Sequence, residues 1–262
     1  MTETTRRRLD VTDLLDRVRS MYTAVADTPS GPFHFEVGHD LAERLGYPAT
    51  VLEAVPSAAT ESFAGVGYFL DLAELQPGEQ VLDLASGSGT DTFASAVAVG
   101  PRGRVTGVDL TPAQLAKAGR LADQAGFAQV AFVEGRIEEP PVAPGSVDCV
   151  ISNGVINLAP DKGAVFRAAA RASRPGGRLA IADIVTAVAL PDGITCDASL
   201  WAACIGGAAE RGEYLALIEA AGFAVQQVRE NTAYRFLSDR ARSATARYGV
   251  TSISVLATRA ST

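Results

Sequence analysis

The chain has 262 residues, 47% of them hydrophobic and 20% charged, and its net charge is −7. This length suits one large fold unit with added segments, and no apolar run approaches the roughly 20 residues that span a bilayer, which excludes a membrane-spanning protein. The acidic balance argues against DNA or RNA as a partner, because nucleic-acid-binding proteins neutralise phosphates with a basic face.

The cysteines and the N-terminus indicate a reducing, intracellular setting. Residues 1–10 hold three arginines but are not followed by the apolar region of a secretory signal, so we expect a cytoplasmic protein. Cys149, Cys196 and Cys204 are too few and too irregularly spaced for a disulfide framework. No Cys-x-x-Cys pair or histidine cluster suggests zinc, and we expect no metal site. The oligomeric state stays open.

The first 75 residues precede the predicted sheet and form an N-terminal helical extension, with a second unit over residues 76–262. A helix is expected over residues 11–26, then a loop through residues 29–35, then helical segments. Such an extension can reach the carboxyl ends of the strands, where ligands bind in open α/β sheets. It is therefore either a lid over the binding site or a packing decoration.

From residue 80 onward, short β-branched runs alternate with helical stretches, which is typical of an α/β fold with helices on both faces of a parallel sheet. A Thr-Pro pair opens one helix at residue 111 and an Arg-Pro-Gly-Gly run follows another at residue 174. The predicted strands cover residues 80–85, 104–109, 130–134, 147–152, 178–184, 224–228 and 252–257. The predicted helices cover residues 111–126, 162–173 and 198–221. The last two of these seven strands are expected to form a hairpin.

The run Val-Leu-Asp-Leu-Ala-Ser-Gly-Ser-Gly at residues 81–89 predicts a nucleotide-like cofactor. Gly87 and Gly89 follow a buried strand and let backbone N–H groups approach a ligand. A dinucleotide fold would need a third glycine where this chain has Thr92. Asp83 is a poor neighbour for pyrophosphate but can accept hydrogen bonds near an ammonium group. The loop therefore favours S-adenosylmethionine (SAM).

Later strand ends supply the other contacts that SAM needs. Asp109 ends the second strand, where a carboxylate can accept hydrogen bonds from both ribose hydroxyls. The end of the third strand would contact the adenine edge. The end of the fourth strand would lie beneath the transferable methyl group. The predicted cofactor-binding residues are Asp83, Ala85, Ser86, Gly87, Gly89, Asp109, Leu110, Ile137, Glu138 and Asn153.

Five stretches resemble a known family: residues 75–84, 108–112, 150–162, 174–185 and 201–208. Together they are similar to class I SAM-dependent methyltransferases of the arsenite methyltransferase branch. The Ser-Asn-x-Val-Ile-Asn-Leu and Cys-Ile-Gly-Gly-Ala motifs are specific to that branch, and the resemblance covers residues 45–223. It implies a Rossmann-like, seven-stranded sheet with helices on both faces, and SAM as methyl donor.

The resemblance also implies three cysteines that hold trivalent arsenic, since thiolates are soft ligands for a soft centre. In this chain Val66 and Gly154 occupy two of those positions, and Cys204 alone is kept. Cys149 lies in an apolar strand and is expected to be a buried core residue. A two-thiol site with Cys196 is conceivable. The remaining pocket favours an organic acceptor.

The acceptor expected from these departures is a small organic metabolite, with secondary metabolism as one setting. Histidine exchanges protons near neutral pH, and His34 and His39 are the two candidate bases. His34 is preferred because Phe33 and Phe35 flank it in a loop rather than on a helix. One alternative is an arsenite or thiol methyltransferase that uses Cys204. Another is a SAM-binding protein with a different activity, such as a cyclisation. The predicted catalytic residues are His34 and Cys204, and the predicted substrate-binding residues are Tyr22, Phe63, Val66, Gly154, Asn157 and Trp201.

Overall fold

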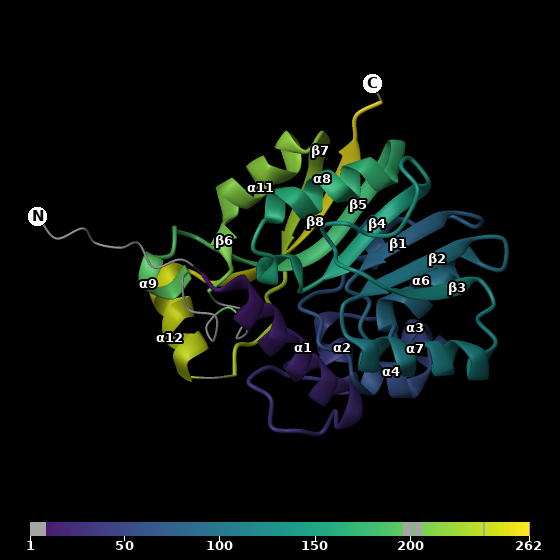
Figure 1. The fold of residues 1–262 in the computed structure, drawn as a ribbon, viewed down its shortest axis with the longest axis horizontal. Helices are drawn as coiled ribbons and strands as arrows, with labels where there is room; N and C mark the ends of the chain where they lie inside the picture. Colours follow the sequence, from purple (N-terminus) through teal and green to yellow (C-terminus); the bar gives the residue numbers. More distant parts are fainter. Residues whose placement is uncertain (1–8, 196–200, 202–205, 238, 262) are drawn as a thin grey trace, which may run out of the picture.

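A computed structural model describes residues 9–195, 201, 206–237 and 239–261 of the chain. Its centre is a twisted sheet in the order β3-β2-β1-β4-β5-β8-β7, flanked by helices (Figure 1). β8 pairs antiparallel with β5 and β7, and the other pairs on this path are parallel. The strands are β1 (Gln80–Leu84), β2 (Arg104–Asp109), β3 (Val130–Glu134), β4 (Val147–Asn153), β5 (Ser173–Thr186), β7 (Phe223–Glu230) and β8 (Thr251–Arg259). The predicted seven-stranded α/β sheet is confirmed.

Alternation along the strands creates two apolar layers. Leu82 and Leu84 of β1 belong to the core cluster on one face, which α8 (Lys162–Ala172) and α11 (Arg211–Ala220) cover. Val81 belongs to the cluster on the other face, beneath α5 (Leu70–Ala73) and α6 (Thr90–Val99). Because successive side chains of a strand point to opposite faces, a strand buried on both sides reads as a continuous apolar run.

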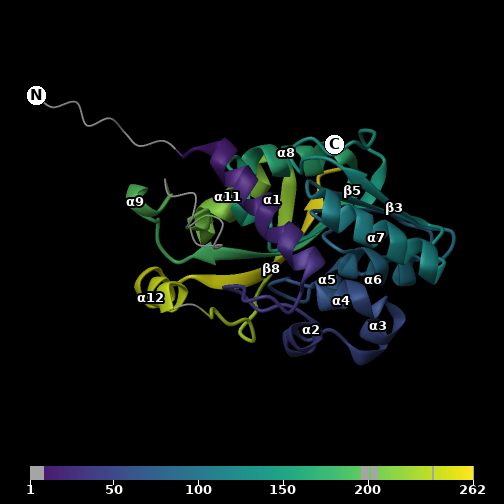
Figure 2. The ribbon, with the colours of Figure 1, turned by 60° about the horizontal axis from the view of Figure 1, so that its bottom comes forward.

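The N-terminal segment packs directly on this sheet unit. It contains α1 (Val11–Asp27), α2 (His39–Leu45), α3 (Ala49–Ala54) and α4 (Ser57–Glu61), and it shares a core cluster with β1 through Phe69 and Ala73. α1 lies against α7 (Pro112–Ala125), as Figure 2 shows. The helix predicted over residues 11–26 is confirmed, while the division of the chain at residue 75 remains a prediction.

Two side chains of α7 fasten α1 near its C-terminal end. Gln114 Nε2 donates to the carbonyl oxygen of Tyr22 at 2.9 Å, and Lys117 Nζ donates to that of Ala26 at 3.2 Å. Lys117 Nζ also lies 2.7 Å from the hydroxyl of Ser62. The position of α1 thus depends on a few polar contacts as well as on apolar packing.

The prediction was wrong in three places beyond β4. Residues 198–221 are not one helix, because the short strand β6 (Ala209–Glu210) pairs with β5 and α11 begins at Arg211, capped by the Glu210 carboxylate. A Cβ on Gly207 would collide with the carbonyl oxygen of Asn157, so the chain needs a glycine at this close approach. β5 begins at Ser173 and contains the predicted Pro-Gly-Gly turn as an irregularity.

The third difference concerns the last two strands. β7 and β8 pair antiparallel as expected, but α12 (Asp239–Tyr248) lies between them in the sequence, so they are not joined by a tight turn. Both α12 and α9 (Asp192–Thr195) lie at the left-hand edge of Figure 1, and Figure 2 shows that they are apart from each other. Within the described ranges, no helix is both long enough and apolar enough to cross a membrane.

Candidate cofactor and substrate site

A cavity of about 1070 Å³, including its mouth, lies at the carboxyl ends of β1, β2 and β4. α1 and residues 62–65 cover it, and the glycine-rich loop after β1 forms one wall. The lining residues are Leu15, Val18, Tyr22, Ser62, Phe63, Ala64, Gly65, Asp83, Ala85, Ser86, Gly87, Ser88, Thr90, Asp91, Asp109, Leu110, Thr111, Gln114, Arg136, Ile137, Glu138, Asn153, Gly154, Val155, Leu158, Ala159 and Pro160. This is where open α/β sheets bind ligands.

The glycine-rich loop adopts a conformation that its residue types dictate. Gly87 and Gly89 have φ of 54° and 97°, and Ala85 has φ of 62°, which costs an ordinary residue about 1 kcal/mol. A Cβ on Gly89 would lie 2.8 Å from the rings of Phe93 and Phe132. Gly89 therefore shapes the loop from behind and does not itself line the cavity.

Asp109 holds the loop to the end of β2. Its Oδ2 accepts from Gly87 N at 2.9 Å, and its Oδ1 accepts from Thr111 N at 2.8 Å. Burial raises the pKa of the Asp109 carboxyl, and these backbone N–H donors lower it in part. Thr111 is the N-cap residue of α7, as predicted, but its side chain makes no capping hydrogen bond.

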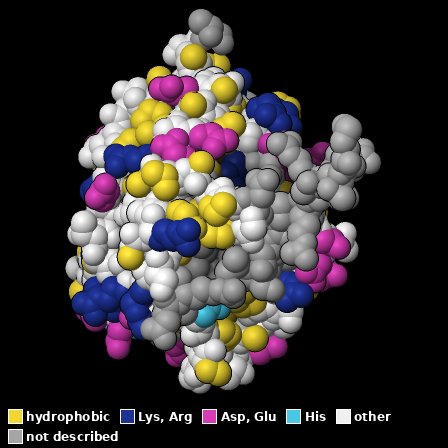
Figure 3. All heavy atoms as spheres, turned by 90° about the vertical axis from the view of Figure 1, so that its left-hand side faces the viewer, with side chains coloured by type: hydrophobic (Ala, Val, Ile, Leu, Met, Phe, Trp, Pro, Cys, Tyr) yellow, Lys and Arg dark blue, Asp and Glu magenta, His cyan; other side chains and the backbone are white. Residues whose placement is uncertain are grey.

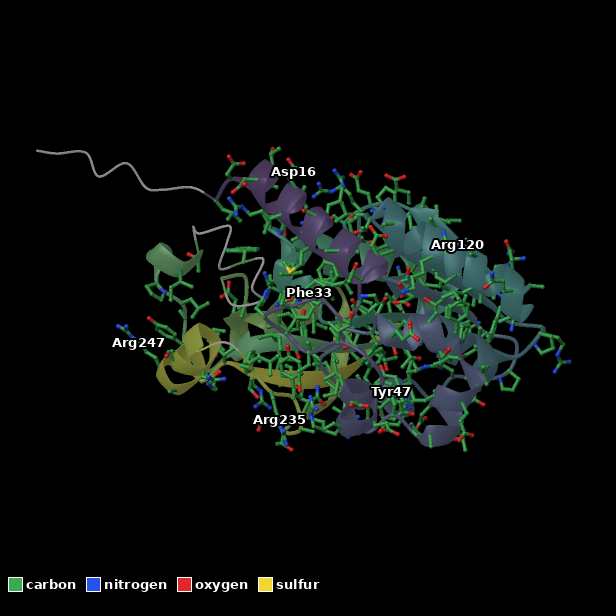
Figure 4. The ribbon with its side chains drawn as sticks, turned by 90° about the horizontal axis from the view of Figure 1, so that it is seen from below. Asp16, Phe33, Tyr47, Arg120, Arg235 and Arg247 are labelled. Atoms are coloured by element: carbon green, nitrogen blue, oxygen red, sulfur yellow. The ribbon has the colours of Figure 1, made fainter. Side chains whose placement is uncertain are left out.

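Two further carboxylates lie deep in the cavity wall. Asp83, 2% exposed, accepts from the Thr92 hydroxyl at 2.6 Å, and its pKa is raised to about 8 by burial and then by the charge of Asp91. Asp91 accepts from the Tyr47 hydroxyl at 2.5 Å and from Asn153 Nδ2 at 3.0 Å, and burial raises its pKa to about 6. Figure 4 labels Tyr47 within the N-terminal helical segment.

Asn153, at the end of β4, ties residues 65–67 to the sheet. Its Oδ1 accepts from Val66 N at 2.8 Å, and its Nδ2 lies 3.0 Å from the carbonyl oxygen of Gly67. A Cβ on Gly65 would lie 2.5 Å from Asn153 Nδ2, so this approach requires glycine.

Val66 and Gly154 form one contact. A Cβ built on Gly154 would lie 3.0 Å from Val66 Cγ1, and Val66 is 2% exposed. In the sequence these two positions are 88 residues apart, and each stands where the resemblance implies a cysteine. The structure brings them together, with a valine methyl group against a backbone that carries no side chain.

Residues 75–222 match the family described as "Methyltransferase domain". The chain belongs to this methyltransferase family. It is 41% identical over 199 residues to an arsenite methyltransferase of Halobacterium salinarum, covering 76% of this chain and 51% of the relative. It is also 40% identical over 152 residues to the human arsenite methyltransferase, covering 55% and 40% of the two chains. The chain thus spans about half the length of the curated relatives that it matches.

Solved structures place the fold in the same class. An arsenic(III) SAM methyltransferase from Chlamydomonas reinhardtii is 29% identical, with a TM-score of 0.63 over 85% of this chain and 74% of that one. A geranyl diphosphate methyltransferase in complex with GPP and sinefungin has a TM-score of 0.66 over 95% and 99% of the chains, and at 18% identity it shows the fold alone. The chain therefore belongs to the class I SAM-dependent methyltransferase family, near the arsenite methyltransferase branch.

The cavity fits SAM chemically. Its acidic wall suits a ligand that carries sulfonium and ammonium charges, and Leu110 and Ile137 provide apolar surface for a base. The Ser86 hydroxyl is buried in the wall without a hydrogen-bond partner, although buried polar groups ordinarily have one. Nine of the ten predicted cofactor residues line the cavity, Gly89 being the exception. Their individual contacts with SAM remain proposals.

The predicted substrate residues divide into two groups. Tyr22, Phe63 and Gly154 line the cavity, whereas Val66, Asn157 and Trp201 are buried outside its lining. Trp201 packs with residues of α1, with Lys162 Nζ 4.8 Å from its ring centroid.

The structure does not bring the predicted base into the cavity lining. The ring of His34 packs edge-on against Phe35 at 4.7 Å, and Phe35 in turn stacks on Tyr22 at 6.0 Å. His39 is an exposed residue of α2. Cys149 is a fully buried core residue, as expected, with its pKa raised to about 12 by burial. Cys196 and Cys204 lie outside the described residues.

Sequence reasoning missed Leu15, Val18, Asp91 and Gln114. An acidic residue in the first turn of a helix ordinarily indicates an interaction with the helix dipole, so Asp91 gave no separate signal. The α1 residues could be assigned only as an amphipathic face. Gln114 bridges the Ser88 hydroxyl at 2.5 Å and the carbonyl oxygen of Tyr22, contacts that depend on the folded arrangement.

Proposed function

We propose that the protein transfers the methyl group of SAM to a small organic metabolite in the cytoplasm. The contact between Val66 and Gly154 carries this proposal, because a thiolate-bound metalloid needs sulfur ligands at these two positions. Gly154 lines the cavity, and Phe63, Val155 and Leu158 give the cavity apolar surface. Such a lining favours an acceptor recognised by shape and apolar contact.

The chain's own residues supply binding, orientation and exclusion of water. SAM supplies a methyl group that its sulfonium already activates. Asp109 fixes the loop that faces the donor, and Asn153 fixes residues 65–67 beside it. Leu15 and Val18 of α1 close the cavity with apolar side chains. Methyl transfer depends on alignment and on a dry site, which these contacts provide.

The acceptor class is tested with methyl-labelled SAM. We expect transfer to at least one compound of an organic acceptor panel, and no methylated arsenic from arsenite with a thiol reductant. Arsenic methylation that Cys204→Ser abolishes would contradict the proposal. Binding of SAM without transfer to any acceptor would favour the alternative of a methyltransferase-like protein with another activity.

Restoring the two thiols provides a matched experiment. Val66→Cys with Gly154→Cys places two sulfur atoms side by side, because these two positions are in contact. We expect this variant to bind trivalent arsenic at least about tenfold more tightly than the wild type, because thiolates are its preferred ligands. The control, Val66→Ser with Gly154→Ser, carries a similar change in size and φ strain at residue 154. Equal arsenic binding by both double variants would contradict the interpretation that Val66 and Gly154 stand at the positions of two lost sulfur ligands.

The lid role of α1 predicts a measurable loosening. Gln114→Leu with Lys117→Met removes the two hydrogen bonds to α1, each worth about 1 kcal/mol, so amides of α1 should exchange about tenfold to thirtyfold faster. The control is Arg120→Met, an exposed residue of the same helix that Figure 4 labels. Hydrogen exchange measured with and without SAM checks the result. Unchanged hydrogen exchange in the double variant would favour the alternative, in which the N-terminal extension only packs on the sheet unit and is not a lid.

A further inference from the structure

We propose that Asp83 and Asp91 form a proton-exchanging pair that distinguishes the charged methyl donor from its uncharged-sulfur product. The pair holds one proton when the cavity is free and is fully ionised when the donor is bound. The product keeps the ammonium but lacks the sulfonium charge, so the pair keeps most of its proton when the product is bound. The inference rests on SAM as donor and not on the identity of the acceptor.

The geometry places both carboxyl groups in one wall. Asp83 is the next-to-last residue of β1 and Asp91 lies in the first turn of α6, and both line the cavity. The Thr92 hydroxyl, next to Asp91 in the chain, donates to Asp83 Oδ2 at 2.6 Å. Over the described ranges, no lysine or arginine forms an ion pair with either carboxyl group. Buried carboxylates without a cation are costly to ionise, and they favour a ligand that brings a positive charge.

The neighbouring charges come from every element around the pair. Asp109 on β2 adds negative charge near Asp83, and the Tyr47 hydroxyl and the Asn153 amide face Asp91 from the N-terminal segment and from β4. At the cavity wall, Arg136 and Glu138 pair with each other at 3.0 Å. The face that Figure 3 shows carries intermixed acidic and basic groups. The cavity wall at Asp83 and Asp91 therefore carries excess negative charge, which a positively charged ligand would balance.

The hydrogen bonds indicate which carboxyl group holds the proton. Asp91 accepts from two side chains, Tyr47 and Asn153, which stabilise its ionised form. Asp83 accepts from one, and the charge of Asp91 raises its pKa further, to about 8. Two buried carboxyl groups in one wall titrate as a pair. Near pH 7, Asp83 is the group that keeps the proton until a cation arrives.

Proton linkage fixes the sign of the effect. A bound sulfonium favours the ionised pair and lowers its pKa, so donor binding releases a proton and tightens as pH rises. SAM and its product S-adenosylhomocysteine share the ammonium and carboxylate, and they differ by the sulfonium charge. Transfer of the methyl group removes that charge. Proton uptake by Asp83 then accompanies the weaker binding of the product.

Calorimetry of the whole protein without acceptor tests this directly. SAM and S-adenosylhomocysteine are titrated between pH 6 and 8, in buffers of different ionisation enthalpy. We expect up to one proton released per SAM bound, and an affinity for SAM that rises by up to about tenfold per pH unit. Binding of the product should release less than half as many protons. The affinity for the product should change by about twofold or less between pH 6 and 8. Equal proton release for the two ligands would overturn the proposal.

Two variants locate the effect. In Asp83→Asn the pH dependence of SAM binding should flatten, and the ratio of the two dissociation constants at pH 8 should fall about tenfold. Tyr47→Phe removes a donor to Asp91 and should shift the pH profile of SAM binding upward. Asp123→Asn, an exposed residue of α7, is the charge-matched control and should leave both ligands unaffected. An unchanged profile in Asp83→Asn would contradict the assignment, whatever the acceptor assays show.

Discussion

Replacing Asp109 with asparagine is expected to weaken SAM binding by at least about a hundredfold and to lower the free energy of unfolding by about 2 kcal/mol. Each Asp109 oxygen accepts one backbone N–H, from Gly87 and from Thr111. An asparagine keeps one acceptor and turns an NH₂ group toward the other N–H. Either the glycine-rich loop or the start of α7 then loses its partner, although the substitution is almost isosteric.

Calorimetry and urea unfolding measure the two parts of this expectation. The buried N–H left without a partner accounts for the loss of stability, since such a group costs about 1–3 kcal/mol. Displacement of the loop, together with loss of the acceptor that we propose for the ribose hydroxyls, is the expected cause of the lower affinity. The exposed Asp123→Asn serves again as control. A variant that binds SAM within about threefold of the wild type would show that Asp109 does not hold the donor site.

The sheet could be predicted from the sequence because its central strands are buried on both faces. β4 shows this best, since all its residues except Asn153 are buried, and its apolar run is visible without a structure. The strand-ending carboxylates Asp83 and Asp109 followed from the same reasoning, because the carboxyl ends of parallel strands meet at one edge.

The remainder depended on contacts between distant segments. Tyr47 lies 44 residues before Asp91 in the chain, and nothing local to either residue indicates their hydrogen bond. The strand β6 is only two residues long and exists through its pairing with β5, so it has no period to detect. Val66 precedes β1 and Gly154 follows β4, so the two residues in contact are separated by four strands in the sequence. Each position was identified as unusual, but their proximity belongs to the fold.

The burial that makes Asp83 useful should also make it destabilising. We expect Asp83→Asn to raise the free energy of unfolding of the SAM-free protein by about 2 kcal/mol at pH 8, and by much less at pH 5. The folded-state pKa is about 8 against an ordinary value of 3.8, so between about pH 4 and 8 the unfolded chain loses a proton that the folded chain keeps. The stability of the wild type therefore falls as pH rises through this window. The asparagine amide in the variant is imperfectly hydrogen-bonded, which offsets part of the gain in the free energy of unfolding.

Urea unfolding of both proteins at pH 5 and pH 8, with and without SAM, separates this effect from ordinary repacking. Saturating SAM binds the folded state only, and it supplies the positive charge that the ionised Asp83 lacks, so it should stabilise the wild type more than the variant at pH 8. The variant would then be the more stable protein when free and would gain less from the donor. Such a trade between stability and function is expected where a cavity keeps a buried charge for its ligand. A pH-independent difference between the two proteins would contradict this account of Asp83.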